Sequence, residues 1–141
     1  MPSPVPGLDA GRSAKAIRPL VLIVDDNDKN RKLARDVLSA AGFQTLEGAT
    51  GAEAIALAAE HLPDVILMDL RLPDMDGTEA AKKLEDGART ARIPVVALSA
   101  LPLEEGGEWL EAAGFAGWLE KPIRVGEFPD QVRRYCAAAR R

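Results

Sequence analysis

Residues 65–77 read VILMDLRLPDMDG, an apolar run that ends on a carboxylate and continues into a loop. A short, uninterrupted run of this kind is typical of a strand buried on both faces, as in a parallel sheet covered by helices. Asp69 then lies where the strand leaves the core, and Pro73 and Gly77 oppose helix formation in the loop. An acid at this position is either the cap of the next turn or the working group of a site.

Four other segments are predicted to form strands, and three of them also end beside a polar or charged residue. These segments are Leu20–Val24 before Asp25 and Asp26, Phe43–Glu47, Pro94–Leu98 before Ser99, and Ala116–Glu120 before Lys121. The segment that begins at Phe43 alternates between apolar and polar residues, which is the period of a strand.

Five segments with apolar residues at helical spacing follow the strands. The first is capped by Asn27 or Asp28 and ended by Gly42, and the second is opened by Thr50 or Gly51 and ended by Pro63. The third runs from about Thr78 to Glu85 and the fourth from Glu104 to Ala113. The last has Phe128, Val132 and Tyr135 on one stripe. Gly106 and Gly107 each cost roughly 1 kcal/mol relative to alanine, so the fourth helix is expected to be short or mobile. Trp109 is expected on its surface or at an interface. Pro129 must lie in the first turn of the last helix.

This alternation predicts a doubly wound α/β domain with a five-stranded parallel sheet and five helices. Right-handed crossovers make the strands parallel, so their carboxyl ends lie at one edge of the sheet. Ligands bind at that edge, where the strand order switches direction. The topology therefore gathers the residues that end the strands, which are Asp25, Asp26, Asp69, Ser99 and Lys121.

Length and composition indicate one domain in a reducing compartment. The chain has 141 residues, of which 47% are hydrophobic and 28% are charged, as is usual for one globular domain. Its formal net charge of -4 gives no general attraction to nucleic acid or anionic membranes. Cys136 is the only cysteine, which rules out an internal disulfide. Without a membrane span or a signal peptide pattern, a cytoplasmic protein is expected. Residues 1–18 are expected to form a mobile tail before a domain of residues 19–141.

The predicted cluster has the parts needed for transfer of a phosphoryl group. Three neighbouring carboxylates repel one another, so one takes up a proton or a cation lies among them. Hard oxygen ligands with room for water suit Mg²⁺, which commonly binds one or two carboxylates together with substrate phosphate. Lys121 supplies a compact positive charge, and Ser99 supplies a hydroxyl donor for phosphoryl oxygens. Asp69 is then the predicted nucleophile.

Four motifs, in this order and at this spacing, identify a known family. They are Val24-Asp25-Asp26-Asn27, Met68-Asp69-Leu70-Arg71-Leu72-Pro73-Asp74-Met75-Asp76-Gly77, Ala97-Leu98-Ser99-Ala100 and Glu120-Lys121-Pro122. From about Leu20 to Arg134, the chain resembles the receiver domain of two-component response regulators. The resemblance implies a flavodoxin-like, CheY-like fold with strand order 2-1-3-4-5.

The resemblance also implies a role for each residue of the acid cluster. Asp69 would accept a phosphoryl group from a histidine kinase or a histidine phosphotransfer protein. Asp26 and Asp69 would bind Mg²⁺ directly, together with the Arg71 backbone carbonyl, and Asp25 would assist through water. Such a receiver is a phosphoacceptor that assists its own phosphorylation and dephosphorylation, and it is not an enzyme.

The remaining motifs imply phosphate binding and a conformational switch. Ser99 and Lys121 would bind the phosphoryl group, with Lys121-Pro122 as a cis peptide. Trp118 stands where the family usually has a tyrosine or phenylalanine that rotates with Ser99, and it is either that switch or core filler. No output domain follows Arg141, so a stand-alone receiver similar to the DivK type is expected. It would signal to a downstream protein through its fourth helix, fifth strand and fifth helix, and would bind neither nucleic acid nor membrane.

Two other classes of function remain open at this point. A phosphatase of the haloacid dehalogenase type also begins with a strand and an aspartate, and Asp26-Asn27-Asp28 has its acid spacing. Against it, Asn30 stands where that motif has threonine or valine, and no cap segment is present. Hydrolysis of p-nitrophenyl phosphate would reveal such an activity. A constitutive, non-phosphorylated interaction module would keep the fold but would not bind beryllofluoride.

Overall fold

Strands and helices alternate along the chain in the computed structural model, which describes residues 18–100 and 103–139, without the side chains of residues 103–107 and 137–139. The strands are β1 (Leu20–Val24), β2 (Gln44–Gly48), β3 (Val65–Asp69), β4 (Val95–Ser99) and β5 (Gly117–Glu120). The helices are α2 (Asp28–Ala40), α3 (Gly51–His61), α4 (Gly77–Asp86), α5 (Leu103–Ala112) and α6 (Phe128–Ala139).

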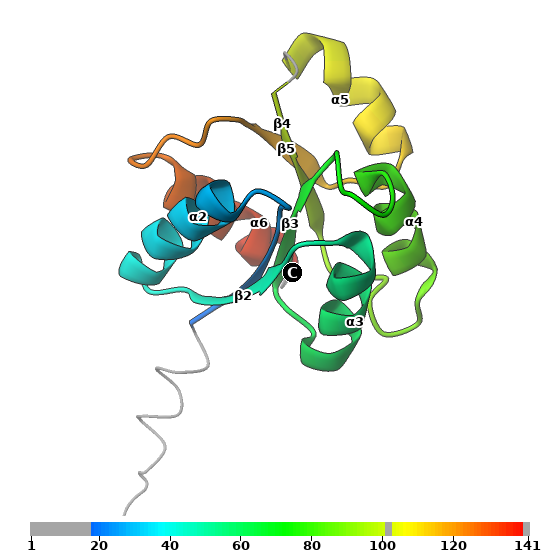
Figure 1. Cartoon of the computed structure of the whole chain (residues 1–141), viewed down its shortest axis with the longest axis horizontal. Coiled ribbons are helices and arrows are strands. Elements are labelled where there is room, and N and C mark those ends of the chain that lie inside the picture. The colour runs from blue at the N-terminus through cyan, green and yellow to red at the C-terminus, as the bar shows by residue number, and fades with distance from the viewer. Residues whose placement is uncertain (1–17, 101–102, 140–141) are drawn as a thin grey trace, which may run out of the picture.

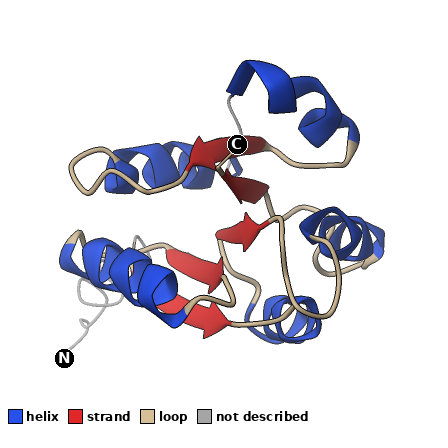
Figure 2. Ribbon diagram, turned by 45° about the horizontal axis from the view of Figure 1, so that its top comes forward, coloured by secondary structure: helices blue, strands red, loops and turns tan. Residues whose placement is uncertain are grey.

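The five strands form one parallel sheet in the order β2-β1-β3-β4-β5. Helices α2 and α6 cover one face of this sheet, and α3, α4 and α5 cover the other (Figure 1, Figure 2). Strand β3 lies at the centre, where Asp69 pairs with Leu98 of β4. The doubly wound fold and its strand order are therefore confirmed.

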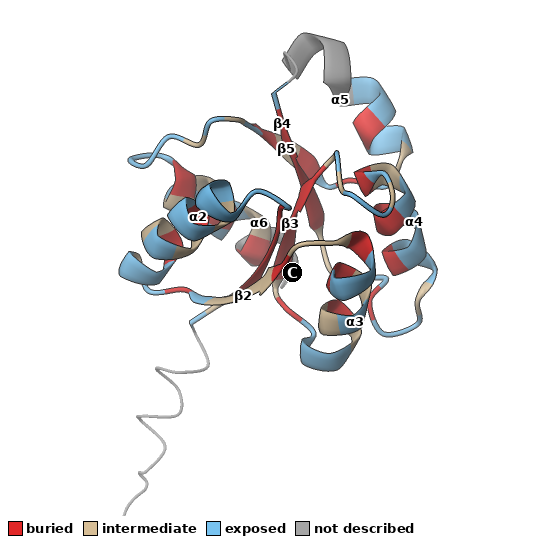
Figure 3. Ribbon diagram, in the orientation of Figure 1, coloured by how far each residue is buried: buried red, intermediate tan, exposed pale blue. Residues whose placement is uncertain are grey.

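Burial follows the position of each strand in the sheet. Every residue of β3 and β4 is buried, whereas the edge strands β2 and β5 contain half-buried and exposed residues (Figure 3). One core cluster, beneath α2 and α6, includes Leu38, Phe43 and Phe128. A second cluster, beneath the other three helices, includes Leu84 and Leu110. The apolar runs of the sequence are continuous because helices cover both sheet faces.

The predicted element boundaries hold to within one or two residues, and the deviations have local causes. Strand β2 begins one residue later than predicted because Phe43 donates its N–H to Leu38 O at the end of α2. Pro129 lies in the first turn of α6, as predicted. Helix α5 has ten residues, as the predicted range Glu104 to Ala113 does, and it begins and ends one residue earlier. The mobility expected from its two glycines stays a prediction. The buried Leu110 anchors α5, and this packing outweighs the low helix propensity of its two glycines.

The predicted tail, residues 1–18, lies outside the described residues except for Arg18. The Nε of Arg18 donates a hydrogen bond to Gly42 O at 3.2 Å. Among the described helices, none combines the length and the apolar character needed to cross a membrane. The cytoplasmic location stays a prediction.

Candidate functional site

The carboxyl ends of β1 and β3 bring three aspartates together. Asp25 and Asp26 follow β1 directly, and Asp69 is the last residue of β3. One carboxylate oxygen from each of the three lies within 4.8 Å of the other two. Asp25 is 1% exposed and Asp69 is 9% exposed, whereas Asp26 is open to solvent. The predicted acid cluster is therefore present, and its two adjacent members differ sharply in burial.

Lys121 binds two of these carboxylates at once. Its Nζ lies 2.9 Å from Asp69 Oδ2 and 3.1 Å from Asp25 Oδ2. Burial acts to lower the pKa of Lys121, but the hydrogen bonds to Asp69 and Asp25 outweigh it and raise that pKa above its ordinary value. The ammonium group therefore stays charged at neutral pH and offsets part of the repulsion between the carboxylates.

Asp25 is held through both its side chain and its backbone. The Asn27 N–H donates to Asp25 Oδ1 at 2.9 Å, and Arg31 Nη1 donates to the Asp25 carbonyl oxygen at 2.7 Å. Burial raises the pKa of Asp25 above its ordinary value, and the hydrogen bonds from Asn27 and Lys121 offset only part of this effect. Ionisation of Asp25 is therefore less favourable in the folded protein than in water, although Lys121 pairs with the carboxylate at 3.1 Å.

Asp69 is oriented by the loop that follows it and by Lys121. The Arg71 N–H donates to Asp69 Oδ1 at 3.1 Å, while Lys121 holds Oδ2. A side chain that accepts a bond from the backbone two residues later is the usual turn of an aspartate. Both oxygens of Asp69 therefore have defined positions at the end of β3.

An open cleft of about 740 Å³ lies at this edge of the sheet and contains the residues predicted for the site. Its lining includes the three aspartates, Arg71, Ser99 and Lys121. Ser99 ends β4 and is buried, at 6% exposure. The peptide bond between Lys121 and Pro122 is cis, as the resemblance implies. The tertiary structure thus brings every predicted phosphate and metal residue to one cavity.

Trp109 also lines this cleft, and the sequence did not indicate this role. The residue lies on α5 and is 43% exposed, so the expected surface position is correct but incomplete. Its neighbour Leu110 is buried, which places Trp109 at the edge of the packed face of the helix. Helical periodicity reveals such an edge position, but not the cavity that the indole borders.

Trp118 does not line the cleft in the described part of the chain. It lies on β5, half-buried against the core cluster beneath α3, α4 and α5. The preceding residue of β5, Gly117, is also tightly packed. The hydroxyl of Tyr135 on α6 lies so close to Gly117 that a Cβ on Gly117 would collide with this hydroxyl. Trp118 therefore contributes to packing, and its rotation as a switch stays a prediction.

The donor set of the acid cluster fits a hard divalent cation. Three carboxylates offer oxygen ligands within reach of one ion, and the cleft is open enough to admit water. Oxygen ligands together with bound water are the coordination that Mg²⁺ prefers.

The second acid of the phosphatase motif, Asp28, is not part of the cleft lining and pairs with Arg31 at 2.6 Å. The geometry therefore favours the metal and phosphate site over the phosphatase.

Comparison with known proteins gives the same family over most of the chain. Residues 21–133 match the response regulator receiver domain family. The chain is 40% identical to the polar-differentiation response regulator DivK of Brucella ovis over 119 residues, which cover 84% of this chain and 97% of that relative.

Two solved structures extend the comparison to the fold. Chemotaxis response regulator CheY4 of Vibrio cholerae is 30% identical, with a TM-score of 0.79 over 84% of this chain and 98% of that one. The receiver domain of sensor histidine kinase PA1611 from Pseudomonas aeruginosa is 30% identical, with a TM-score of 0.77 over 85% of this chain and 98% of that one. That structure has a magnesium ion coordinated in the active site cleft.

The aspartate triad of this chain matches the magnesium site of receiver domains, and Lys121 and Ser99 border the same cleft. Its fold, its motifs and its relatives therefore agree. The chain belongs to the response regulator receiver domain family, whose members are phosphoacceptors rather than catalytic enzymes and have a histidine kinase as partner.

Proposed function

We propose that Asp69 accepts a phosphoryl group from a histidine kinase or a histidine phosphotransfer protein. The observation that carries this proposal is the position of Asp69, which ends the central strand within reach of two other carboxylates and 2.9 Å from Lys121 Nζ. A carboxylate oxygen of Asp69 forms a bond to phosphorus while the bond between phosphorus and the imidazole nitrogen of the donor breaks.

Lys121 and Ser99 bind the transferred group in this proposal. Lys121 Nζ moves its hydrogen bond from an Asp69 oxygen to a phosphoryl oxygen, which keeps its positive charge beside the new anion. Ser99 lies at the end of β4 in the same cleft, and its hydroxyl donates to a second phosphoryl oxygen. These two groups account for the stabilisation that the chain itself supplies.

Asp25, Asp26, Asp69 and the backbone carbonyl of Arg71 are proposed to hold Mg²⁺, with Asp25 acting through water. Bound Mg²⁺ supplies positive charge that offsets the repulsion between the carboxylates and the incoming phosphate. The exposure of Asp26 supports a direct ligand that a hydrated ion can reach from solvent. The magnesium ion in the PA1611 receiver supports the same assignment by analogy.

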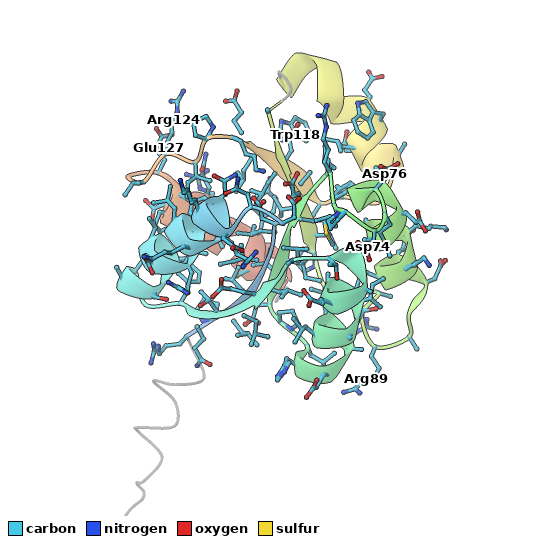
Figure 4. The ribbon with its side chains drawn as sticks, in the orientation of Figure 1. Asp74, Asp76, Arg89, Trp118, Arg124 and Glu127 are labelled. Carbon is cyan, nitrogen blue, oxygen red and sulfur yellow. The ribbon has the colours of Figure 1, made fainter. Side chains whose placement is uncertain are left out.

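Phosphorylation is proposed to control the binding of a downstream protein at the face formed by α5, β5 and α6. Ser99 ends the strand that precedes α5, so movement of its hydroxyl toward the phosphoryl group also displaces the start of that helix. Trp118, Arg124 and Glu127 border a small surface cavity on this face (Figure 4). A constitutive interaction module would bind its partner at this face equally well with and without beryllofluoride. A response regulator controlled by phosphorylation would bind its partner differently in the two conditions.

The test is incubation with acetyl phosphate and Mg²⁺, followed by intact mass measurement. Wild-type protein is expected to gain one phosphoryl group, and Asp69→Asn to gain none, because the amide keeps the shape but not the nucleophile. Asp76→Asn is the matched control, since Asp76 lines the same cleft outside the acid triad and its variant should be labelled normally. Labelling of Asp69→Asn to the wild-type level would show that the phosphoacceptor is another residue.

A further inference from the structure

The loop of residues 70–76 joins β3 to α4 and carries the Arg71 carbonyl proposed to bind metal. Its base is closed by local hydrogen bonds. Gly77 N–H donates to Leu70 O at 2.8 Å, and Arg71 pairs with Asp76 in an isolated antiparallel bridge. The base of the loop is therefore a narrow, hairpin-like closure that leaves the tip, residues 72–75, to be held by other contacts.

Asp74 ties the tip of this loop to helix α3. Its Oδ1 accepts a hydrogen bond from the Gly51 N–H at 2.8 Å, and its Oδ2 accepts one from the Ala52 N–H at 3.0 Å. These are the first two residues of α3, whose N–H groups have no partner inside the helix. Figure 4 shows Asp74 beside the start of α3. Both oxygens of one carboxylate are thus used to join two elements that are distant in sequence.

Met75 reinforces this junction. A Cβ added to Gly51 would lie 2.5 Å from Met75 Cγ, so the loop tip packs directly on the first residue of the helix. Helix α3 is itself fixed to the sheet, because Ala54 and Ala58 on its inner face are completely buried. Asp74 therefore connects the loop to a rigid part of the molecule.

We propose that Asp74 is a positioning residue for the metal site, which holds the 70–76 loop against α3 so that the Arg71 carbonyl keeps the position needed to bind Mg²⁺. The proposal rests on the function proposed for the site. Partners that orient a metal ligand without touching the ion contribute strongly to affinity, and their loss typically weakens binding by about tenfold or more. Among the described residues, the hydrogen bonds that join this loop to a helix other than α4 are those of Asp74.

The charge of Asp74 is suited to this role. The hydrogen bonds from Gly51 and Ala52 hold the pKa of Asp74 below its ordinary value, so the side chain is ionised at neutral pH. A negative charge also interacts favourably with the N-terminus of a helix. The tie between the loop and α3 therefore persists over the neutral pH range.

Two measurements test this proposal. In the first, the metal-free protein is titrated with MgCl₂ and the Kd is obtained from the changes in amide chemical shifts. In the second, the rate of hydrogen exchange of the Arg71 amide is measured. Asp74→Ala removes both acceptors and is expected to raise the Kd for Mg²⁺ by about tenfold and to speed exchange of the Arg71 amide. Asp74→Asn keeps one acceptor oxygen and should lie between Asp74→Ala and the wild type. Both changes are at an exposed side chain and leave the core intact.

Two variants control for a loss of stability. Thr50→Ala removes the N-cap of the same helix, where Thr50 Oγ1 accepts from the Glu53 N–H at 3.0 Å, and leaves the loop untouched. In the wild type, the Leu20 N–H donates a hydrogen bond to Asp64 Oδ2 at 2.7 Å. Asp64→Asn weakens this bond, which also joins a carboxylate to a backbone N–H but lies at the start of β1, away from the 70–76 loop. Both controls are expected to lower Tm without changing the affinity for Mg²⁺.

The outcomes separate this inference from the proposed function. Wild-type affinity and unchanged Arg71 exchange in Asp74→Ala would overturn the positioning role, and so would an equal loss of affinity in Thr50→Ala. Failure of acetyl phosphate to label wild-type protein would overturn the proposed phosphotransfer. In that case, the titration and the exchange measurement would still decide the role of Asp74.

Discussion

At the scale of single residues, Asp25 and Asp26 show how burial divides two identical neighbours. Asp25 is almost completely buried and its pKa is raised, chiefly by burial, while Asp26 lies in solvent. Burial of this carboxylate lowers the stability of the metal-free protein, while the proposed function gives the same carboxylate a role at the metal site. Stability and function therefore make opposite demands on the same side chain.

Asp25→Asn is expected to stabilise the metal-free protein by about 1 kcal/mol at pH 7, because the neutral amide removes an unfavourable buried charge. A carboxyl group with a raised pKa binds more protons in the folded state than in the unfolded state, so its destabilising effect grows as pH rises through that pKa. The advantage of Asp25→Asn should therefore shrink as pH falls through the same range. Thermal unfolding at several pH values measures it.

Asp26→Asn is the matched control for this prediction, since the exposed neighbour has no comparable burial. Its Tm in metal-free buffer should change less than that of Asp25→Asn. Equal stabilisation by the two variants, or a gain in Asp25→Asn that does not depend on pH, would show that burial of the Asp25 charge is not the cause.

At the scale of elements, the start of α4 lies against the end of β3 without space for a side chain. A Cβ on Gly77 would lie 2.6 Å from Asp69 O and 2.8 Å from Leu70 Cα, both of which are backbone atoms that cannot move independently. Glycine at this position thus allows the first turn of α4 to close over the residue that carries the phosphate in the proposed reaction. The glycine of the DMDG segment is required by the close approach of two elements.

Gly77→Ala is expected to lower the free energy of unfolding by about 1–3 kcal/mol and to weaken Mg²⁺ binding, because the new methyl group displaces the backbone of Asp69 and Leu70. Denaturant unfolding and the MgCl₂ titration measure the two effects. Gly126→Ala is the control, since nothing lies within 4 Å of a Cβ at Gly126. If both variants behaved alike, the close approach at Gly77 would have no energetic consequence.

At the scale of the whole molecule, the cleft and the proposed output face share helix α5. Trp109 of α5 lines the cleft, and Trp118 of β5 is half-buried beside the output face. In the proposed switch, the protein has an inactive and an active conformation that differ at α5 and β5. A ligand can shift the balance between these two conformations only if it interacts differently with each of them. Ser99 joins the cleft to α5 and is the residue through which that difference is proposed to act.

Beryllofluoride with Mg²⁺ is expected to change the fluorescence of both tryptophans, for different reasons. In Trp118→Phe, the remaining Trp109 borders the cleft and should respond to ligand binding with or without Ser99. In Trp109→Phe, the remaining Trp118 reports the switch, and Ser99→Ala should abolish most of its response. The prediction would be refuted by a silent Trp118 together with unchanged amide exchange in α5 and β5. Asp69→Asn, which cannot form the adduct, is the control.

Much of the fold follows from local patterns. The apolar runs, the helical segments between them and the turn residues predict a doubly wound α/β domain, because hydrophobic period, strand length and turn chemistry act over a few residues. The receiver family was indicated separately, by the resemblance of four motifs. Local helix propensity alone does not account for α5. Gly106 and Gly107 have low helix propensity, but burial of Leu110 against the sheet depends on residues far along the chain.

The sequence by itself therefore determined the order of the elements and which side chains end the strands, among them Asp69, Ser99 and Lys121. The tertiary structure alone decided that Asp25 is buried while Asp26 is exposed, that Trp109 borders the cleft, and that Asp74 is bound to α3. Periodicity places a residue on a face of its own element. Contacts between elements depend on their packing, which brings together residues such as Asp74 and Gly51 that no local pattern relates.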